Sequence, residues 1–286
     1  MKIVISVDME GASGIVTGRE TGYPRVAAGD PEATPDYLTS RGWLTADVNA
    51  AVEGAIEAGA TEFVLHDTHG CDRRNVVLDQ LHPAVEVVRG APIIFFDYRD
   101  LSTSSYDAAF LIAMHARAGE AGVISHVLDW PLLREVRING QPVGESQLTA
   151  ALAGHYGIPT VLITGDNVVC DDMKAWTRGQ IQTAAVKQSL SRYAVRCLPL
   201  GEARRRIRQA AYDAVKNAGN ATPMRFEPPI TLELELADRE VAWYVSWMPG
   251  IRHDGDRTVS FTGGDFLEVY KALLAMFWIA TSALNP

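Results

Sequence analysis

Two carboxylates that are separated by a single residue are the feature of this sequence that most directly suggests a functional site. Asp8 and Glu10 stand at the end of an apolar strand that begins at Lys2, just before a loop that contains Gly11 and Gly14. Alternate side chains of a strand share a face, so both carboxylates project to the same side. Two adjacent anions favour a bound cation, although one such pair alone is also explained by a helix cap beside a solvated side chain.

Histidines follow several other apolar, strand-like runs of the chain. His69, His115 and His126 each stand within four residues of the end of such a run, at 63–65, 108–113 and 122–124, and Glu145 follows later. In open α/β sheets the loops beyond the carboxyl ends of the strands converge on one crevice. Carboxylate and imidazole ligands suit zinc, with manganese or another divalent ion as the alternative. The sequence therefore predicts a metal site.

A series of motifs runs along the chain in a fixed order. They are SVDMEG at 6–11, DTHG at 67–70 with Arg74-Asn75 after it, MHARAG at 114–119, His126, INGQPVGE at 138–145, TGDN at 164–167, the run 185–187 and PGIRHDGDRTVSF at 249–261. Each string alone is weak evidence. Their number, order and spacing resemble the zinc-dependent D-aminopeptidases, the DppA family, over nearly the whole chain.

The resemblance implies a site built from six residues. It implies two zinc ions per subunit, with Asp8 as the bridging carboxylate and His126 as the catalytic histidine beside the metals. It does not assign the other ligands to one ion or the other. The implied metal ligands are Asp8, Glu10, His69, His115 and Glu145.

Three positions depart from the residues that are common in that family. His66 stands in place of a small polar residue, Ala113-Met114 in place of Gly-Tyr, and Val127 in place of Thr. All three lie within three residues of an implied site residue in the sequence. The departures therefore bear on the lining of the pocket and on the preferred substrate, rather than on the metals.

The expected reaction is the hydrolysis of an amide, which needs a nucleophile, a stabiliser for the oxyanion and an acid for the leaving amine. Two divalent ions supply the first two, because they lower the pKa of bound water from about 16 toward about 7 and polarise the carbonyl. A free histidine, with an ordinary pKa near ~6.5, completes the set. His126 either transfers this proton or attacks the carbonyl itself; proton transfer is favoured because a metal-activated water already serves as the nucleophile.

Other polar residues have both a structural and a functional interpretation. Asp67 is placed to orient the imidazole of His69, as carboxylates often do behind metal-bound histidines. Lys187 is expected from its sequence to be exposed, whereas the resemblance implies a pocket residue, which would bind a peptide carboxylate or hold the tetrahedral intermediate. Asn75 and Asp166 are weaker candidates, either for supporting the site residues from behind or for positioning the substrate.

The composition is that of a soluble globular protein. The chain has 286 residues, 47% of them apolar and 21% charged, and a net charge of −9 that disfavours nucleic-acid binding. The apolar run 272–284 is shorter than the ~20 residues that cross a bilayer, so we expect a buried or subunit-contacting helix and no membrane. With no secretory leader evident, we expect a cytoplasmic protein with Cys71, Cys170 and Cys197 reduced.

Strands and helices are expected to alternate through the first two thirds of the chain. This order predicts an α/β fold with a largely parallel sheet and helices on both faces, plus a smaller C-terminal α+β portion. We expect a catalytic, metal-binding domain at 1–200 and a portion at 201–286 that packs on it or serves assembly. The loop 18–41 is longer than a plain connector and is expected to cover the site or contact a neighbour. The expected strands are 2–7, 62–65, 85–88, 108–113, 160–164 and 230–236, and the expected helices are 45–58, 145–156, 171–176 and 202–216.

Together these features predict a zinc-dependent aminopeptidase that removes the N-terminal residue from short peptides, with the preference for D or L residues left open. The resemblance also implies a homo-oligomer, with a homodecamer of stacked five-membered rings as one arrangement. Two alternatives remain. A two-metal phosphoester hydrolase would use the same ligands, but no phosphate cradle or basic motif accompanies them. A noncatalytic metal-binding assembly protein would have no use for His126.

Overall fold

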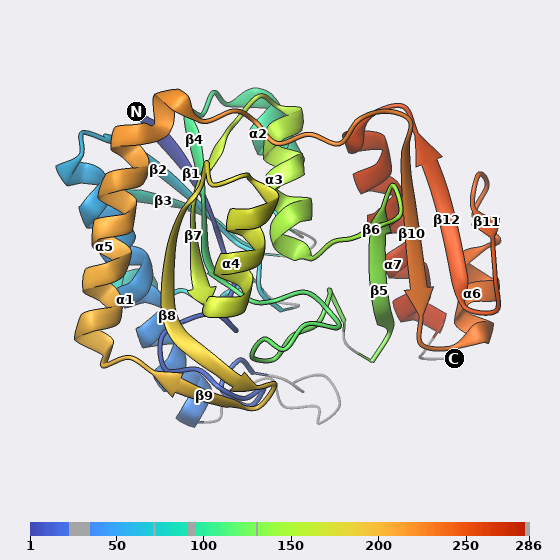
Figure 1. Cartoon of the computed structure of the whole chain (residues 1–286), viewed down its shortest axis with the longest axis horizontal. Helices are drawn as coiled ribbons and strands as arrows, with labels where there is room; N and C mark the ends of the chain where they lie inside the picture. Colours follow the sequence, from blue (N-terminus) through green and yellow to red (C-terminus); the bar gives the residue numbers. More distant parts are fainter. Residues whose placement is uncertain (23–34, 71–72, 91–94, 130, 284–286) are drawn as a thin grey trace.

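Two β-sheets lie side by side in the computed structural model, which describes residues 1–22, 35–70, 73–90, 95–129 and 131–283 (Figure 1). One sheet has seven strands and is almost entirely parallel, and the other has five antiparallel strands. The predicted α/β fold with a largely parallel sheet and a smaller, separate α+β portion is confirmed. Cys71 and residues 23–34 of the expected loop 18–41 lie outside the described residues, and the end of that expected loop, 35–41, is helical instead.

The parallel sheet has the strand order β3-β2-β1-β4-β7-β8-β9. Only β9 runs antiparallel to its neighbour. The side chains of β1, β4 and β7 are buried almost without interruption, as expected for central parallel strands that are covered on both faces. The strands are β1 Lys2–Val7, β2 Glu62–Asp67, β3 Val85–Val88, β4 Ala108–Met114, β7 Thr160–Asp166, β8 Gln182–Ser191 and β9 Ala194–Cys197.

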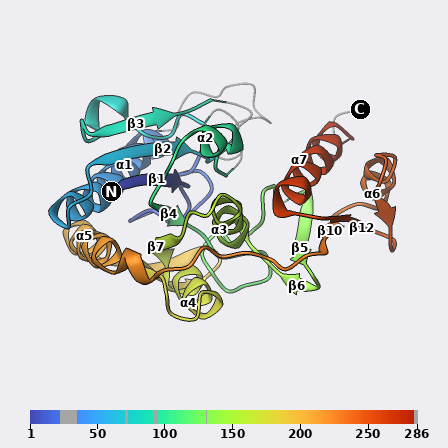
Figure 2. The same cartoon turned by 90° about the horizontal axis from the view of Figure 1, so that it is seen from above.

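Helices cover both faces of this sheet (Figure 2). On one face α1 (Pro35–Glu57) and α5 (Leu200–Asn217) pack against each other and against the sheet. The other face carries α3 (Glu145–His155) and α4 (Asn167–Trp176). In the described residues this part also contains the short helix α2 (Tyr98–Thr103) and two 3₁₀ helices, Leu78–Gln80 and Ala218–Asn220.

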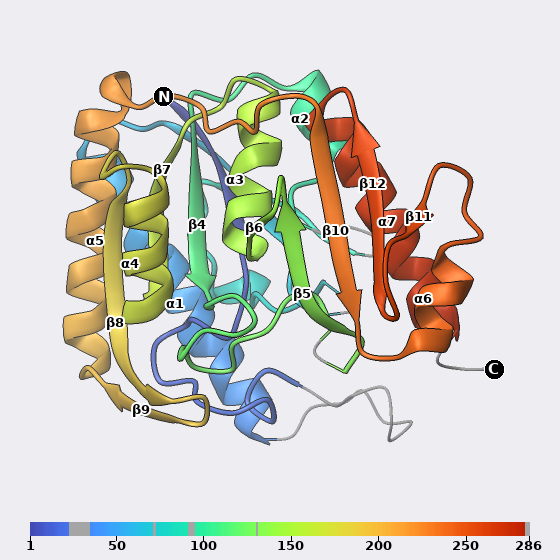
Figure 3. The ribbon, with the colours of Figure 1, turned by 45° about the vertical axis from the view of Figure 1, so that its right-hand side comes forward.

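The antiparallel sheet has the order β11-β12-β10-β5-β6. Its central strand β10 alternates buried and partly exposed residues, as its alternating apolar and acidic sequence predicts. Two helices, α6 and α7, pack against this sheet (Figure 3). The elements are β5 Leu133–Ile138, β6 Gln141–Pro142, β10 Ile230–Leu236, α6 Arg239–Val245, β11 Arg252–His253, β12 Thr258–Gly263 and α7 Phe266–Ala283.

The two sheets do not divide the chain at residue 200. After β4 the chain leaves the parallel sheet, adds the hairpin β5–β6 to the antiparallel sheet and returns through α3. Conversely, α5 follows residue 200 but packs against α1 and β8. One continuous apolar core joins Leu148 of α3, Leu234 of β10 and Leu273 of α7, so the second sheet packs on the first. The division into two domains stays a prediction.

Among the described residues, α7 is the one helix long and apolar enough to cross a membrane by length and composition. Its buried residues recur at helical spacing and include Val269, Leu273, Met276 and Ala280. That face packs on the antiparallel sheet, on α3 and on α6. The pattern is that of an amphipathic core helix, and the helix expected at the end of the chain is present, with one face buried.

Candidate metal centre

The predicted ligands stand where the strand order of the parallel sheet reverses. The order runs 3-2-1 on one side and 4-7-8 on the other, so the loops after β1 and β4 separate at this point and leave a crevice. Asp8 follows β1, His69 follows β2 and His115 follows β4, while Glu145 is the first residue of α3. Residues far apart in sequence therefore meet at one edge of the sheet.

Two groups of ligands face each other across Asp8. In the first, His69 Nδ1 lies 3.0 Å from Asp8 Oδ1 and 3.1 Å from Glu10 Oε2. In the second, His115 Nε2 lies 3.3 Å from Asp8 Oδ2 and 3.3 Å from Glu145 Oε1. The two oxygens of Asp8 thus contact histidines of different groups, and this carboxylate joins them.

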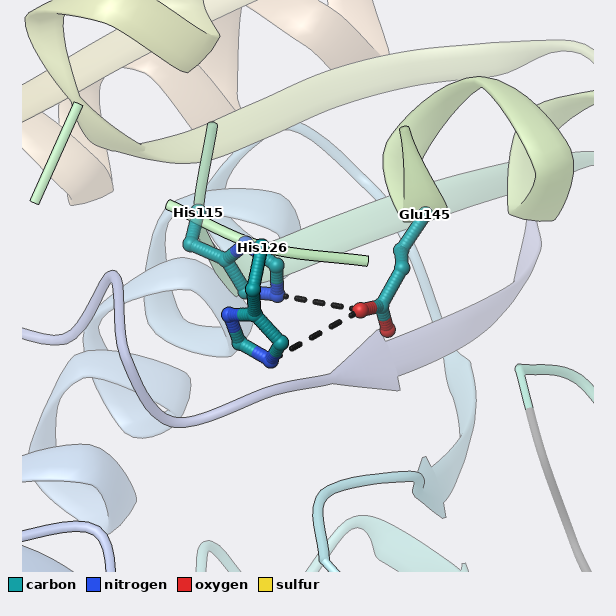
Figure 4. Close-up of side chains that lie close together, drawn as sticks. All are labelled: His115, His126 and Glu145. Atoms are coloured by element: carbon teal, nitrogen blue, oxygen red, sulfur yellow. Dashed lines mark ion pairs between the residues drawn. The ribbon is translucent and has the colours of Figure 1, made fainter. Parts of the chain in front are cut away.

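His126 completes the second group. Its ring stacks on that of His115, with the ring centroids 4.0 Å apart and the planes at 10°. Its Nε2 lies 3.9 Å from Glu145 Oε1, and Figure 4 shows both imidazoles directed at this carboxylate. All six predicted site residues are therefore brought together.

Each of the three histidines has one ring nitrogen hydrogen-bonded to a backbone carbonyl. His69 Nε2 lies 2.9 Å from the carbonyl oxygen of Thr21, and His115 Nδ1 lies 2.9 Å from that of Ala116. His126 Nδ1 lies 2.7 Å from the carbonyl oxygen of Ile124. A ring nitrogen that donates to a carbonyl carries the proton, so in the neutral imidazole the other nitrogen presents its lone pair to the site.

Asp67 does not orient His69, contrary to the sequence-based interpretation. Its carboxylate instead accepts hydrogen bonds from Asn75 Nδ2 at 2.6 Å and from the backbone N–H of Val76 at 3.1 Å. Asn75 Nδ2 also donates to the carbonyl of His69 at 2.8 Å. Asp67 therefore acts on His69 through the backbone, by fixing the loop that carries it. The imidazole is oriented by the carbonyl of Thr21, a backbone group that no sequence pattern marks.

The segment 122–124 is a turn rather than the expected strand. Ile124 and Leu128 adopt left-handed backbone angles, with φ of 46° and 54°, which are strained for side chains of this kind. Three hydrogen bonds hold the segment around His126. The backbone N–H of Val123 donates to Asp166 Oδ2 at 2.7 Å, that of Ile124 to the carbonyl of Arg192 at 2.8 Å, and that of Leu128 to Glu145 Oε1 at 2.7 Å.

The donor set fits a pair of cations. In each group, three ligand atoms from different residues lie within 4.8 Å of one another. Asp8 Oδ2 and Glu10 Oε2 are buried and accept no hydrogen bond, and a buried carboxylate oxygen is costly unless a cation balances it. Imidazole nitrogen and carboxylate oxygen are ligands that zinc prefers. By geometry alone, His126 is a possible ligand of the second group as well.

The pKa shifts of the site residues show that the buried carboxylates favour positive charge beside them. Burial, and next the charge of Glu10, raise the pKa of Asp8 to about 7. Burial disfavours the protonated form of His115, yet the nearby carboxylates, Glu145 above all, raise its pKa to about 10. The pKa of His69 is raised well above its usual range in the same way, against burial, by Glu10 and Asp8. A divalent cation competes with these protons for the same nitrogen atoms.

Lys187 is buried, and the expectation that it is exposed is wrong. Its ammonium donates to three backbone carbonyls of the loop after β1, those of Glu10 at 2.6 Å, Ala12 at 2.8 Å and Ile15 at 2.7 Å. All three of its hydrogens are used, so none is left for a peptide carboxylate. Burial lowers the pKa of Lys187 to about 8. The lysine therefore fixes the loop that follows the paired carboxylates.

The loop after β1 also packs directly on β4. The backbone N–H of Gly11 donates to the carbonyl of Ala113 at 2.8 Å, and a Cβ at this position would lie 2.0 Å from the carbonyl oxygen of Met114. Only glycine permits this approach. On the opposite side, the N–H of Ser13 donates to the buried carboxylate of Asp47 at 2.8 Å. No sequence pattern marks Asp47, because a lone acidic residue in a helix is ordinary.

The three positions that depart from the family's common residues are all buried. His66 is held by the backbone N–H of Asp97 at 3.0 Å and by Asp100 Oδ2 at 3.0 Å. Met114 and Val127 have at most 2% of their surface exposed. These residues pack behind the site residues, so they affect the substrate pocket through the positions of their neighbours.

Two facing groups of carboxylate and imidazole side chains at the switch point of a parallel α/β sheet fit a metal-dependent hydrolase. Residues 1–275 match the sequence profile of one family, described as D-aminopeptidase. The chain therefore belongs to the D-aminopeptidase family, a family of peptidases, and the resemblance predicted from the motifs is confirmed.

A curated relative and a solved structure, both from Bacillus subtilis, are similar to this chain. The curated relative, the D-aminopeptidase of strain 168, is 32% identical over 281 residues, which cover 98% of each chain. The solved structure superimposes with a TM-score of 0.86 at 30% identity and covers 98% of both chains. It is described as the Zn-dependent D-aminopeptidase DppA, a self-compartmentalizing protease.

Replacing Lys187 tests its proposed role in fixing the loop. We expect Lys187→Met to lower the free energy of unfolding by about 2 to 3 kcal/mol, because three buried carbonyls lose their donor. We also expect weaker zinc binding, because the loop carries Glu10. Denaturant titration and a competitive zinc-binding assay measure the two effects. The control is Lys174→Met on the exposed side of α4, which should change neither. A Lys187→Met protein with unchanged stability and zinc affinity would contradict this role.

Proposed function

We propose that this chain is a binuclear zinc aminopeptidase that removes the N-terminal residue from short peptides. The observation that carries the proposal is the position of Asp8, whose two oxygens face His69 Nδ1 at 3.0 Å and His115 Nε2 at 3.3 Å. One oxygen directed to each group is the arrangement that a bridging ligand between two ions requires. The Zn-dependence of the structural relative supports zinc as the metal.

Each ion has its own set of residues in this proposal. Glu10 and His69 would hold one ion and His115 and Glu145 the other, and Asp8 would contribute one oxygen to each. When bound, the zinc ions acidify a water molecule and polarise the carbonyl of the scissile peptide bond. The backbone N–H of Leu128 donates to Glu145 Oε1 at 2.7 Å and so orients this carboxylate.

His126 moves the proton that the reaction must transfer. Burial and the charge of His115 lower the pKa of His126, so the free ring is neutral near pH 7. Its Nε2 faces the site while Nδ1 is held by the carbonyl of Ile124. A neutral imidazole in this position can accept a proton from the attacking water and deliver it to the leaving amine. Direct attack by His126 on the carbonyl is the alternative, and it leaves the water without a role.

The proposed substrate is a short peptide with a D residue at its N-terminus. The descriptions of the family, of the curated relative and of the solved structure support the D preference. The site itself is compact, since the side chains of His69 and His126 have only 10% and 14% of their surface exposed. Such a site suits small substrates better than folded proteins.

We further propose a cytoplasmic homo-oligomer, with a homodecamer as the expected state. The description of the structural relative as self-compartmentalizing supports assembly. So does an exposed aromatic cluster on and just after α6, in which Trp243, Tyr244 and Trp247 contact one another with ring centroids 4.8 to 5.5 Å apart. Exposed apolar patches of this kind commonly mark protein interfaces. Native mass spectrometry gives the number of subunits directly.

One observation favours the phosphoester hydrolase as a second candidate. Arg134 and Arg192 line a cavity beside His126, although the sequence showed no basic motif next to the ligands. Guanidinium groups bind phosphate as well as carboxylate. Membership of a peptidase family favours the peptide substrate, and p-nitrophenyl phosphate serves as the competing substrate in the assay.

Metal removal tests the proposal. We expect the purified protein to hold two zinc ions per subunit and to release free amino acid from D-dipeptides faster than from their L counterparts. Chelation should abolish cleavage, and added zinc should restore it, because the metals supply the nucleophile. Elemental analysis and a dipeptide panel with p-nitrophenyl phosphate provide the measurements. Cleavage of the phosphate ester alone would contradict the aminopeptidase assignment and favour the phosphoester hydrolase. Bound zinc with no cleavage of any substrate would contradict it and favour the noncatalytic metal-binding protein.

Replacing His126 separates catalysis from metal binding. We expect His126→Ala to lower kcat/KM by about 10²- to 10⁴-fold, the usual contribution of a proton-transferring group, while both zinc ions stay bound. Asp8→Asn should instead reduce the zinc content itself. The control is His253→Ala, because His253 is exposed on β11 and belongs to neither group. Loss of zinc from His126→Ala would show that His126 is a ligand, and full activity would remove it from the mechanism.

A further inference from the structure

A cavity of about 260 Å³ opens beside His126, outside the two groups of metal ligands. It lies where the two sheets meet, because its walls come from the loop after β4, from the start of β5 and from the turn between β8 and β9. Its lining includes Glu120, Ser125, His126, Leu133, Arg134 and Arg192.

Charged side chains line the cavity. Arg134 and Arg192 contribute two guanidinium groups, and Glu120 contributes one carboxylate. That carboxylate is paired with Nη2 of Arg117. Guanidinium groups present planar pairs of N–H donors that match the two oxygens of a carboxylate. The cavity is therefore suited to an anionic end of a small molecule.

Hydrogen bonds fix the position of the turn that carries Arg192 relative to His126. The backbone N–H of Ile124 donates to the carbonyl of Arg192 at 2.8 Å, and the carbonyl of Ile124 lies 2.7 Å from His126 Nδ1. Nearby, Ser189 Oγ donates to the carbonyl of Ala121 at 2.9 Å. One short segment thus connects Arg192 and His126, and the cavity has a fixed position relative to the proton donor.

The position of His126 identifies which part of a peptide enters the cavity. A group that protonates the leaving amine must lie next to the nitrogen of the scissile bond, so the space beyond it receives the leaving residue. In a dipeptide the terminal carboxylate is only two bonds from that nitrogen. Each added residue moves the carboxylate outward by up to ~3.3 to 3.6 Å. At about 260 Å³ the cavity is smaller than the ~300 to 1,000 Å³ pockets of drug-sized ligands.

We infer that this cavity binds the C-terminal residue of a dipeptide and that Arg134 and Arg192 hold its free carboxylate. This inference rests on the proposed aminopeptidase function. It adds that the preferred substrate is a dipeptide with a free C-terminal carboxylate. Neutralising the carboxylate, or extending the peptide beyond the cavity, removes the charged contact without altering the scissile bond.

The test compares peptides that differ only at their C-terminal end. The probes are alanyl-alanine of the cleaved chirality, its C-terminal amide and the corresponding tetrapeptide. For the wild-type zinc enzyme we expect kcat/KM to fall about 10- to 100-fold from the free acid to the amide, mostly through KM, the usual effect of losing a charge-assisted hydrogen-bond pair. The tetrapeptide should resemble the amide. Equal rates for acid and amide would overturn the inference and leave the aminopeptidase standing.

Variants assign the effect to the two arginines. Arg192→Met and Arg134→Met should each lower kcat/KM about 10-fold more for the acid than for the amide, and Arg192→Lys should restore part of the difference because it keeps the charge. Arg196→Met, an exposed arginine on β9 outside the cavity, is the matched control and should keep the wild-type ratio. Zinc content is measured for each protein. Equal losses for acid and amide would mean a structural role and would overturn the inference, whereas a wild-type enzyme that cleaves no peptide would overturn it together with the proposed function.

Discussion

The structure depends on keeping two carboxylates side by side in a buried place. Asp8 and Glu10 are each at most 5% exposed, and burial of adjacent anions is costly without positive charge close by. Two histidines on the surrounding elements supply that charge. His69 and His115 approach Asp8 from the two neighbouring strands, and the raised pKa of each histidine records the same demand. A cation pair satisfies it while leaving the histidines neutral.

Much of the remaining structure holds this cluster in place through the backbone. Lys187 ties three carbonyls of the loop after β1, and Gly11 lets that loop lie against β4. Asp166 and Glu145 hold the turn on either side of His126, where Ile124 and Leu128 are strained. Strain of this kind persists only where surrounding contacts impose it, and here they fix the direction of one imidazole. The catalytic geometry is thus set by residues that need not touch a substrate.

The sequence predicted those features that depend on local pattern. Strands 2–7, 85–88 and 230–236 have the expected bounds, because a short apolar or alternating run has few other conformations in a packed protein. The six predicted site residues, which the structure brings together, were indicated by their motifs. Three other features were not predicted, because each depends on a partner that is distant in the sequence. The turn at 122–124 depends on Arg192 and Asp166, and the burial of Lys187 depends on the carbonyls of the loop after β1. The position of β5–β6 depends on its pairing with β10. The arginine-lined cavity also combines distant segments and has no local signature.

The central claim is that Asp8 joins two metal-binding groups. Anomalous diffraction at the zinc edge, from crystals of the zinc-loaded protein, tests it most directly. The account predicts two peaks per subunit, both within about 2.0 to 2.2 Å of an oxygen of Asp8, one beside Glu10 and His69 and the other beside His115 and Glu145. A single peak, or peaks that do not contact Asp8, would contradict it.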